Sequence, residues 1–254
     1  MKTIKWCKYN TLRLLDTVKI YYFIFIFVLT FLVAVSYNSR GSMSSSGLEF
    51  ATVVFLFIAG LNSFTNNFRF SQANSLSRYV FFKGTVLSIL PIAFIMSVTD
   101  FFINRIYNIF VPCPTNYDMI YTSYRITGMY DWLTNEFVWV QSNEFQVILG
   151  TILWQFAIYV AVFLTGLLIT LIYYRSSKIM KFIVTAIPII IFMFFRNIYN
   201  MLSEGFIAYF KSFITFIFGW ESRNPYAATV TFLVYSMILT VCLYALIRKA
   251  VIKN

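Results

Sequence analysis

The chain has 254 residues, of which 60% are hydrophobic, 21% aromatic and only 11% charged. A soluble domain carries about 25% charged residues, so this composition excludes a soluble globule and a disordered chain. The formal net charge of +11 does not indicate a nucleic-acid partner, because the apolar residues stand in long uninterrupted runs. Runs of this kind are typical of membrane-spanning helices. The composition predicts an all-α polytopic membrane protein.

Several kinds of chemistry are excluded by residue types that the sequence lacks. Histidine is absent, and the three cysteines, Cys7, Cys113 and Cys242, have no CxxC spacing. This removes imidazole bases, His-ligated zinc and Ser-His or Cys-His catalytic pairs. The sequence has no phosphate-loop motif (GxxxxGKS or GxxxxGKT), so nothing in it is recognisable as an ATP site. We therefore expect no catalytic residue, no metal site and no bound cofactor on this chain.

Six apolar segments are predicted to cross the membrane, because a crossing helix needs about 20 mostly apolar residues. In chain order they are residues 20–37, 50–68, 79–99, 145–174, 182–195 and 226–247. The fourth segment is long enough to cross at a tilt, whereas the fifth has only fourteen residues and contains Pro188. The alternative for the first segment is a signal peptide, since it ends in a loose signal-peptidase site. Cleavage there would leave the orientation of the other spans unchanged.

The distribution of charge predicts the orientation of these spans. If both termini are cytoplasmic, the inner segments are residues 1–19, 69–83, 175–181 and 248–254, and they hold fourteen of the twenty Lys and Arg residues. The same segments hold only one of the nine acids, Asp16. Cytoplasmic loops of membrane proteins carry the excess of Lys and Arg. We therefore expect a multi-pass protein of the cytoplasmic membrane with both termini in the cytoplasm.

Residues 1–19 are predicted to form a separate cytoplasmic segment ahead of the six-span domain, which covers residues 20–254. Apolar residues recur there at near-helical spacing among basic ones, with Trp6, Arg13 and Leu15 as the key positions. A basic amphipathic helix with a tryptophan lies in the headgroup plane of an anionic leaflet. The segment is either such an interfacial helix, which also contacts a cytoplasmic partner, or a plain basic topology signal.

The largest outer segment, residues 100–144, is too small for a core of its own and is expected to cap the spans. Asp100 and Arg105 are positioned to pair across about one helical turn within it.

The outer segment 196–220 is predicted to form a re-entrant or interfacial hairpin between the fifth and sixth spans. Its apolar part, residues 206–219 (FIAYFKSFITFIFG), is too short to cross the bilayer. This hairpin is either a gate near an exit or a packing lid. The candidate outer-gate residues are Phe206, Phe210, Lys211 and Phe213.

The spans are poor in ionisable residues, which bears on the kind of transport. Residues 20–37, 145–174 and 226–247 contain no acid or base, while Lys83 and Asp100 lie near span ends. Ion-coupled carriers usually hold charged residues near the membrane midplane, so ion-coupled transport is disfavoured. The remaining wall of Phe, Tyr, Ile and Leu can receive an amphipathic or lipid-like solute.

The loop between the second and third spans reads NNFRFSQANSLSRYVFFKG at residues 66–84. It is short, basic and rich in Ser and Asn, and it resembles the cytoplasmic coupling helix of small bacterial ABC exporter permeases with six spans per subunit. That family also has a terminal interfacial helix and outer re-entrant helices between spans five and six, so the likeness covers most of the chain. Within the family, the chain looks most like exporters of amphipathic peptides, including the phenol-soluble-modulin type.

The resemblance implies that this chain is the permease subunit of an exporter. Its partners would be a separate ABC ATPase subunit, which binds ATP and Mg, a second permease subunit of the same or a homologous chain, and membrane lipid. The substrate would be an amphipathic peptide or a lipid-like molecule. The implied ATPase-coupling residues, with Phe70 and Leu76 as anchors and Arg78 as the charged contact, are Phe70, Gln72, Asn74, Leu76, Ser77, Arg78 and Lys178.

Two alternatives stay open at this point. The loop at residues 66–84 can be an ordinary positive-inside loop with no partner. The whole protein can be a non-transporting membrane protein, namely an immunity or sensor protein that binds a peptide at its outer face. The substrate, the direction of movement and the choice between a homodimer and a heterodimer are equally open.

Overall fold

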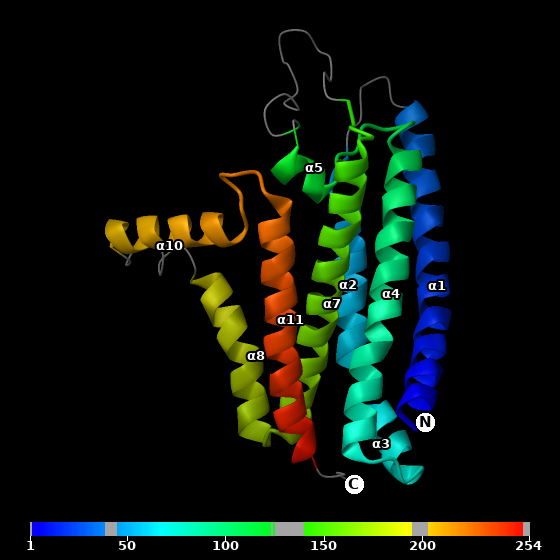
Figure 1. Ribbon diagram of the computed structural model, residues 1–254, viewed down its shortest axis with the longest axis vertical. Coiled ribbons are helices and arrows are strands. Elements are labelled where there is room, and N and C mark those ends of the chain that lie inside the picture. The colour runs from blue at the N-terminus through cyan, green and yellow to red at the C-terminus, as the bar shows by residue number, and fades with distance from the viewer. Residues whose placement is uncertain (1, 39–44, 123, 125–139, 195–202, 251–254) are drawn as a thin grey trace.

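A computed structural model describes residues 2–38, 45–122, 124, 140–194 and 203–250. This part of the chain is all-helical and contains no strand. Figure 1 shows the long helices side by side in one bundle. The helices are α1 (Lys2–Asn38), α2 (Glu49–Asn62), α3 (Thr65–Ala73), α4 (Arg78–Tyr107), α5 (Asn116–Tyr121), α7 (Phe145–Arg175), α8 (Lys178–Met193), α10 (Glu204–Ile217) and α11 (Pro225–Arg248).

Five segments within the described ranges are long and apolar enough to cross a membrane. They are α1, α2 together with α3, α4, α7 and α11, and they coincide with five of the six predicted spans. The remaining predicted span, residues 182–195, falls mostly in α8, which has only 16 residues and leans away from the bundle in Figure 1. A sixth crossing therefore stays a prediction.

The predicted span 50–68 is divided between two helices. α2 ends at Asn62. At this end Asn62 Nδ2 donates to the carbonyl of Ile58 at 3.0 Å, and Ser63 Oγ donates to that of Ala59 at 2.6 Å. Side chains that bond backbone carbonyls in this way often bend a helix. The last residues of the predicted span accordingly begin α3.

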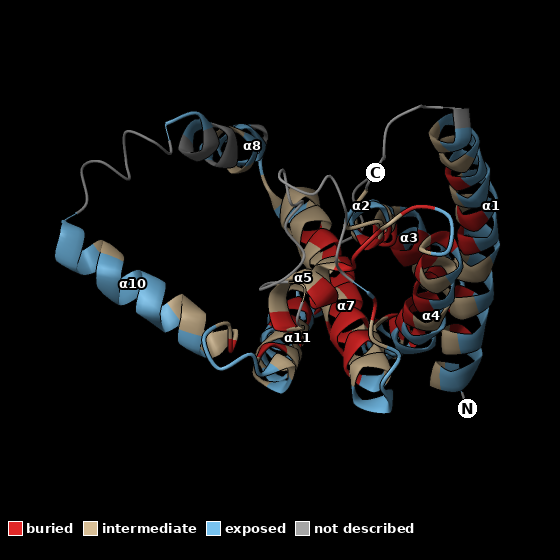
Figure 2. Cartoon of the chain, turned by 90° about the horizontal axis from the view of Figure 1, so that it is seen from above, coloured by how far each residue is buried: buried red, intermediate tan, exposed pale blue. Residues whose placement is uncertain are grey.

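The N-terminal segment is helical and continues into the first predicted span, because α1 is one helix of 37 residues with no break near residue 19. Its predicted place in the headgroup plane stays a prediction. At 1.5 Å per residue it is about 55 Å long, well beyond the hydrocarbon core of a bilayer. Trp6 is only 4% exposed, and its Nε1 donates to Thr85 Oγ1 of α4 at 3.3 Å. The Trp6 ring also packs on Gly84 of α4, because a Cβ added at Gly84 would lie 2.3 Å from Cδ1 of Trp6. Figure 2 shows the buried stripe of α1 turned toward α4.

Helix α7 occupies the centre of the bundle, with α2, α4 and α11 packed around it. It approaches α2 closely, since a Cβ added at Gly60 would lie 2.3 Å from the carbonyl oxygen of Phe163. A Cβ added at Gly166 would lie 2.4 Å from the carbonyl oxygen of Phe57. Only glycine lets two backbones approach this closely. The pair Gly60 and Gly166 thus sets the distance between α2 and α7.

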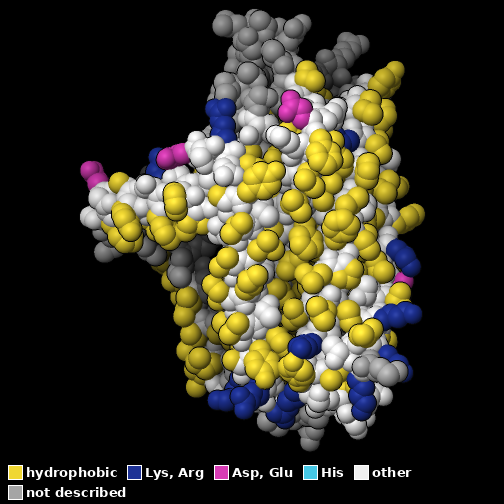
Figure 3. Space-filling view, viewed as in Figure 1, with side chains coloured by type: hydrophobic (Ala, Val, Ile, Leu, Met, Phe, Trp, Pro, Cys, Tyr) yellow, Lys and Arg dark blue, Asp and Glu magenta, His cyan; other side chains and the backbone are white. Residues whose placement is uncertain are grey.

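The two ends of the bundle carry opposite charge. Figure 3 shows Lys and Arg side chains gathered at the lower end and hydrophobic side chains along the walls. We call the end with α3, the start of α1 and the end of α11 the basic end, and the opposite end, with α5, the acidic end (Figure 1). The described acids other than Asp16 lie closer to the acidic end than to the basic end. They are Glu49, Asp100, Asp118, Glu144, Glu204 and Glu221.

Candidate functional site

The loop predicted to couple to an ATPase forms a tight turn at the extreme of the basic end. We call residues 70–78 the α3–α4 elbow. Leu76 N donates to the carbonyl of Ser71 at 2.9 Å, and Gln72 Nε2 donates to the carbonyl of Leu76 at 3.1 Å. Ser77 caps α4, because its Oγ accepts from Val80 N at 3.3 Å. The turn is therefore held by its own hydrogen bonds and joins α4 directly.

The predicted anchors Phe70 and Leu76 are partly engaged within the chain. The Phe70 ring stacks on Tyr9 and Trp6 of α1 with centroid distances of 5.5 and 6.3 Å, and it remains 48% exposed. Leu76 is half-buried against the core. Both residues fix the elbow to the bundle, so only part of each surface faces outward.

Arg78, the predicted charged contact, also has a partner in the chain. Its Nη1 donates to the carbonyl oxygen of Arg248 at 2.8 Å, at the carboxyl end of α11, where helix carbonyls lack intrahelical donors. The exposed tip of the elbow consists of Ala73, Asn74 and Ser75. The predicted residue Lys178 begins α8, and its side chain lies outside the described part.

A polar ladder connects the elbow helix α3 to α1 and α4. Asn67 Nδ2 of α3 donates to Asn10 Oδ1 at 3.3 Å, and Asn10 Nδ2 donates to Ser88 Oγ of α4 at 2.6 Å. Arg13 Nη1 donates to Asn67 Oδ1, and Leu15 is half-buried against the core. Two of the residues assigned to an interfacial helix, Arg13 and Leu15, thus help to join α1 to the bundle.

Helix α10 carries the candidate gate residues and stands apart from the bundle. It contains no buried residue, and Figure 1 shows it crosswise to the long helices near the acidic end. Phe206, Phe210 and Phe213 are each about half exposed, and Lys211 is exposed. Figure 3 shows hydrophobic side chains along its lower side. This is the geometry of an amphipathic surface helix; the hairpin predicted for residues 196–220 falls partly outside the described residues and stays a prediction.

The structure also reveals a buried acid that sequence reasoning placed at a span end. Asp100 is 4% exposed and joins three helices: Tyr22 OH of α1 donates to its Oδ1 at 2.7 Å, and Tyr159 OH of α7 donates to its Oδ2. The predicted pairing with Arg105 is wrong. Residues five apart on a helix point about 140° from one another, and the Arg105 Cζ lies 5.0 Å from the Phe101 ring centroid instead.

Above Asp100, the outer segment covers the acidic end with a polar network. Gln141 Nε2 lies 2.9 Å from both Asn104 Oδ1 and Asp118 Oδ2, while Glu49 Oε1 accepts from Asn116 N at 2.6 Å. Burial raises the pKa of the Cys113 thiol to about 11, so this thiol stays protonated at neutral pH. The network closes this end of the bundle with side-chain amides and carboxylates.

Comparison of the chain with models of protein families, with curated proteins and with solved structures finds no significant match. The likeness of residues 66–84 to a coupling helix therefore stays a prediction. At the basic end, the elbow is capped by Ser77, continues into α4, and contacts α1 through Phe70 and α11 through Arg78.

Proposed function

We propose that this chain is the transmembrane subunit of an ATP-driven exporter of the ABC class, with its basic end in the cytoplasm. A separate ATPase subunit, which carries ATP and Mg, binds the α3–α4 elbow and moves it. A second permease subunit completes the path for an amphipathic or hydrophobic solute. The observation that carries the proposal is the elbow itself, a preformed turn with an exposed tip whose base is fixed to α1, α4 and α11.

The exposed tip suits a docking surface because its residues take no part in the core. Ala73 and Ser75 are exposed, and Ser75 adopts a positive φ of 53°, which makes the turn sharp. The base is held by Leu76 and by the bond from Arg78 to Arg248. A partner that binds the tip therefore transmits force to the bundle, because the elbow is fixed at its base and does not unfold as a free loop would.

Force applied at the elbow has a direct route into the bundle. Helix α4 continues from the elbow for 30 residues and is bonded to α1 through Ser88 and to α1 and α7 through Asp100. A ligand-driven change requires a partner that binds the two states of the bundle with different affinity. Because α4 is attached to α1 and α7, a movement of the elbow is transmitted through α4 to both of these helices.

The remaining elements have places in this proposal. α8 is the sixth crossing, α10 lies in the headgroup plane of the outer leaflet with its phenylalanines toward lipid, and the start of α1 reaches the inner leaflet. The positive-inside rule supports this orientation, because the lysines and arginines gather at the basic end (Figure 3). The chain itself supplies no phosphate loop, so the energy source belongs to the partner.

The test is co-purification of an ATPase with the full-length protein from the membranes of its own cells. The variant Ala73→Arg enlarges the exposed tip, and the positive charge at the carboxyl end of α3 is compatible with the helix dipole. We expect a co-purifying protein with a phosphate-loop sequence, identified by mass spectrometry, and a decrease of about 30-fold in its yield with Ala73→Arg.

The matched control is Ala73→Ser, which changes the same residue without enlarging it and is expected to retain the ATPase. Leu76→Asp and Arg78→Glu are less informative variants, because each also removes a contact within the chain. Equal recovery of the ATPase with Ala73→Arg, or the absence of any phosphate-loop protein from the wild-type preparation, contradicts the proposal.

A further inference from the structure

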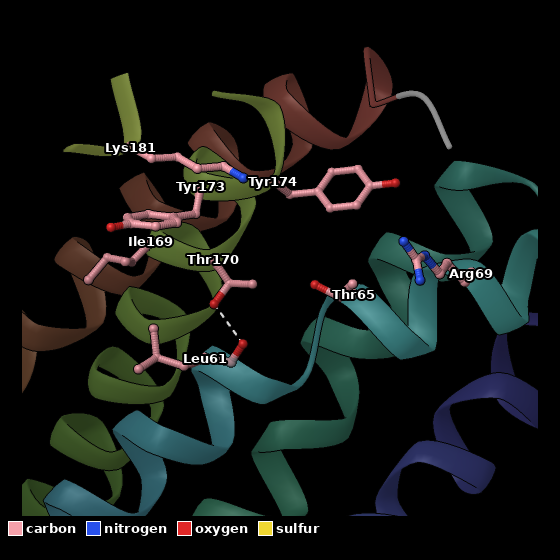
Figure 4. Close-up of a pocket in the computed structure, with 8 residues that line it drawn as sticks. All are labelled: Leu61, Thr65, Arg69, Ile169, Thr170, Tyr173, Tyr174 and Lys181. Carbon is pink, nitrogen blue, oxygen red and sulfur yellow. Dashed lines mark hydrogen bonds between the residues drawn. The ribbon is translucent and has the colours of Figure 1, made fainter. Parts of the chain in front are cut away.

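A pocket of about 530 Å³ opens on the side of the bundle at the basic end. Figure 4 shows that it lies between the end of α2 and α3 on one wall and the last turns of α7 with α8 on the other. Its volume is within the range of about 300–1,000 Å³ found for ligand sites. The residues that line it are Leu61, Thr65, Arg69, Ile169, Thr170, Tyr173, Tyr174 and Lys181.

The pocket is apolar at its inner part and cationic at its rim. Leu61 and Ile169 lie on the side toward the middle of the bundle, about one helical turn deeper than Tyr173. Arg69 and Lys181 belong to opposite walls, and Figure 4 shows both cationic groups directed toward the space between them. This arrangement matches a ligand with a negative head and an apolar body.

The walls of the pocket are held in place by contacts within the chain. Thr170 Oγ1 donates to the carbonyl of Leu61 at 2.6 Å, as the dashed line in Figure 4 marks. The Tyr174 ring packs edge-on against Phe64 with a centroid distance of 5.2 Å. On the other wall, the Tyr173 hydroxyl is hydrogen-bonded to Thr185 of α8. The pocket is therefore formed before any ligand arrives, which lowers the entropic cost of binding.

We propose that this pocket binds an anionic phospholipid from the leaflet at the basic end, with the phosphate between Arg69 and Lys181. Phosphate oxygens accept strong hydrogen bonds from guanidinium and ammonium groups, and the hydroxyl of Thr65 lies in the same lining. The glycerol and the first acyl carbons lie on Leu61 and Ile169. A free phosphate ion would satisfy the two cations but would leave this apolar part uncovered, so the geometry favours the lipid.

The test compares the retention of phosphatidylglycerol and phosphatidylcholine by the full-length protein, measured by native mass spectrometry after release from detergent micelles. The wild type is expected to retain phosphatidylglycerol preferentially. Arg69→Gln and Lys181→Gln are each expected to lower that preference about fivefold, which is what one cation near an anionic surface contributes. Ile169→Trp, which fills the apolar part and leaves the charge unchanged, is expected to lower retention of phosphatidylglycerol as well.

The matched control is the pair Lys2→Gln and Lys5→Gln, two exposed lysines of α1 at the same end that do not line the pocket. They are expected to leave the preference unchanged. The proposal is overturned if both pairs lower it equally, since the effect then comes from diffuse surface charge. It is also overturned if Ile169→Trp has no effect while glycerol 3-phosphate displaces the bound lipid, because the site then recognises a soluble phosphate. The ATPase proposal is unaffected by either result.

Discussion

Replacement of Asp100 with leucine is expected to lower the free energy of unfolding by about 2–4 kcal/mol, because the buried Tyr159 hydroxyl loses a charged acceptor worth about 1.5–3 kcal/mol. The Tyr22 hydroxyl loses its stronger acceptor but keeps the Met96 carbonyl at 3.2 Å. Asp100 accepts from Tyr22 of α1 and Tyr159 of α7, so its loss weakens two helix contacts at once. The measurement is thermal unfolding of the purified protein in detergent, together with the fraction that elutes as a single species.

Asp100→Asn provides the graded comparison, because the amide keeps one carbonyl oxygen as an acceptor. We expect it to cost about half as much as Asp100→Leu. Tyr159→Phe removes one donor only and is expected to fall near the asparagine variant. If Asp100→Leu unfolds at the wild-type temperature, Asp100 does not hold α1 and α7 to α4.

The second large effect is expected at the contact between α2 and α7. Gly60→Ala and Gly166→Ala each place a methyl group against the backbone of the neighbouring helix, at 2.3 Å from the Phe163 oxygen and 2.4 Å from the Phe57 oxygen. Because backbone cannot rotate away as a side chain can, the helices must separate. Overpacking of this kind costs about 1–3 kcal/mol or more, measured as a lower unfolding temperature of each variant.

Gly205→Ala is the matched control for these two variants. Gly205 lies in α10, and a Cβ added there has no atom within 4 Å. Because Gly205 is in the first turn of α10, the same substitution is expected to be neutral or to stabilise this helix by less than the roughly 0.5–1 kcal/mol that alanine gains over glycine in a helix interior. Equal unfolding temperatures of all three variants would mean that Gly60 and Gly166 do not lie at a close contact between α2 and α7. Gly60 and Gly166 share one contact, so the effects of Gly60→Ala and Gly166→Ala should not add in the double variant.

The helices that the sequence predicts best are those made of long apolar runs. The predicted span 79–99 begins one residue after α4 does, and residues 145–174 and 226–247 nearly coincide with α7 and α11. Helix α4 continues to Tyr107, beyond the predicted end at Thr99. The prediction assigned Asp100 to the outer segment, but Asp100 is buried within α4 and bonded to α1 and α7. Asn104 is buried as well, and its amide donates to the carbonyl of Cys113 in the outer segment.

Contacts between distant residues are what periodicity does not predict. Tyr22 and Tyr159 are 78 and 59 residues from Asp100 in the chain, and no spacing in the sequence relates them. The same limit explains Trp6, which the sequence suggests as a membrane-surface anchor. The Trp6 ring fits against α4 because Gly84 has no side chain there. Neither residue alone indicates that the two are in contact.

At the elbow, the sequence predicts the turn but not its attachments. Ser77 is a recognisable helix cap before α4, and the structure has it in that role. The stacking of Phe70 on Tyr9 and the bond from Arg78 to Arg248 depend on where α1 and α11 lie. Phe70, Ser77 and Arg78 stay exposed beside the tip residues Ala73, Asn74 and Ser75, so the predicted coupling residues stay a prediction and the tip adds a surface that the sequence did not indicate.

The orientation of the elbow is tested most directly by cysteine labelling in intact cells. Cys7, Cys113 and Cys242 are first replaced by alanine, and a single cysteine is then introduced as Ala73→Cys at the elbow or Asn143→Cys at the acidic end, both at exposed positions. With a membrane-impermeant maleimide, we expect Asn143→Cys to react in intact cells and Ala73→Cys to react only after the cells are opened. Reaction of Ala73→Cys in intact cells would place the elbow outside the cell, where no ATPase can drive it.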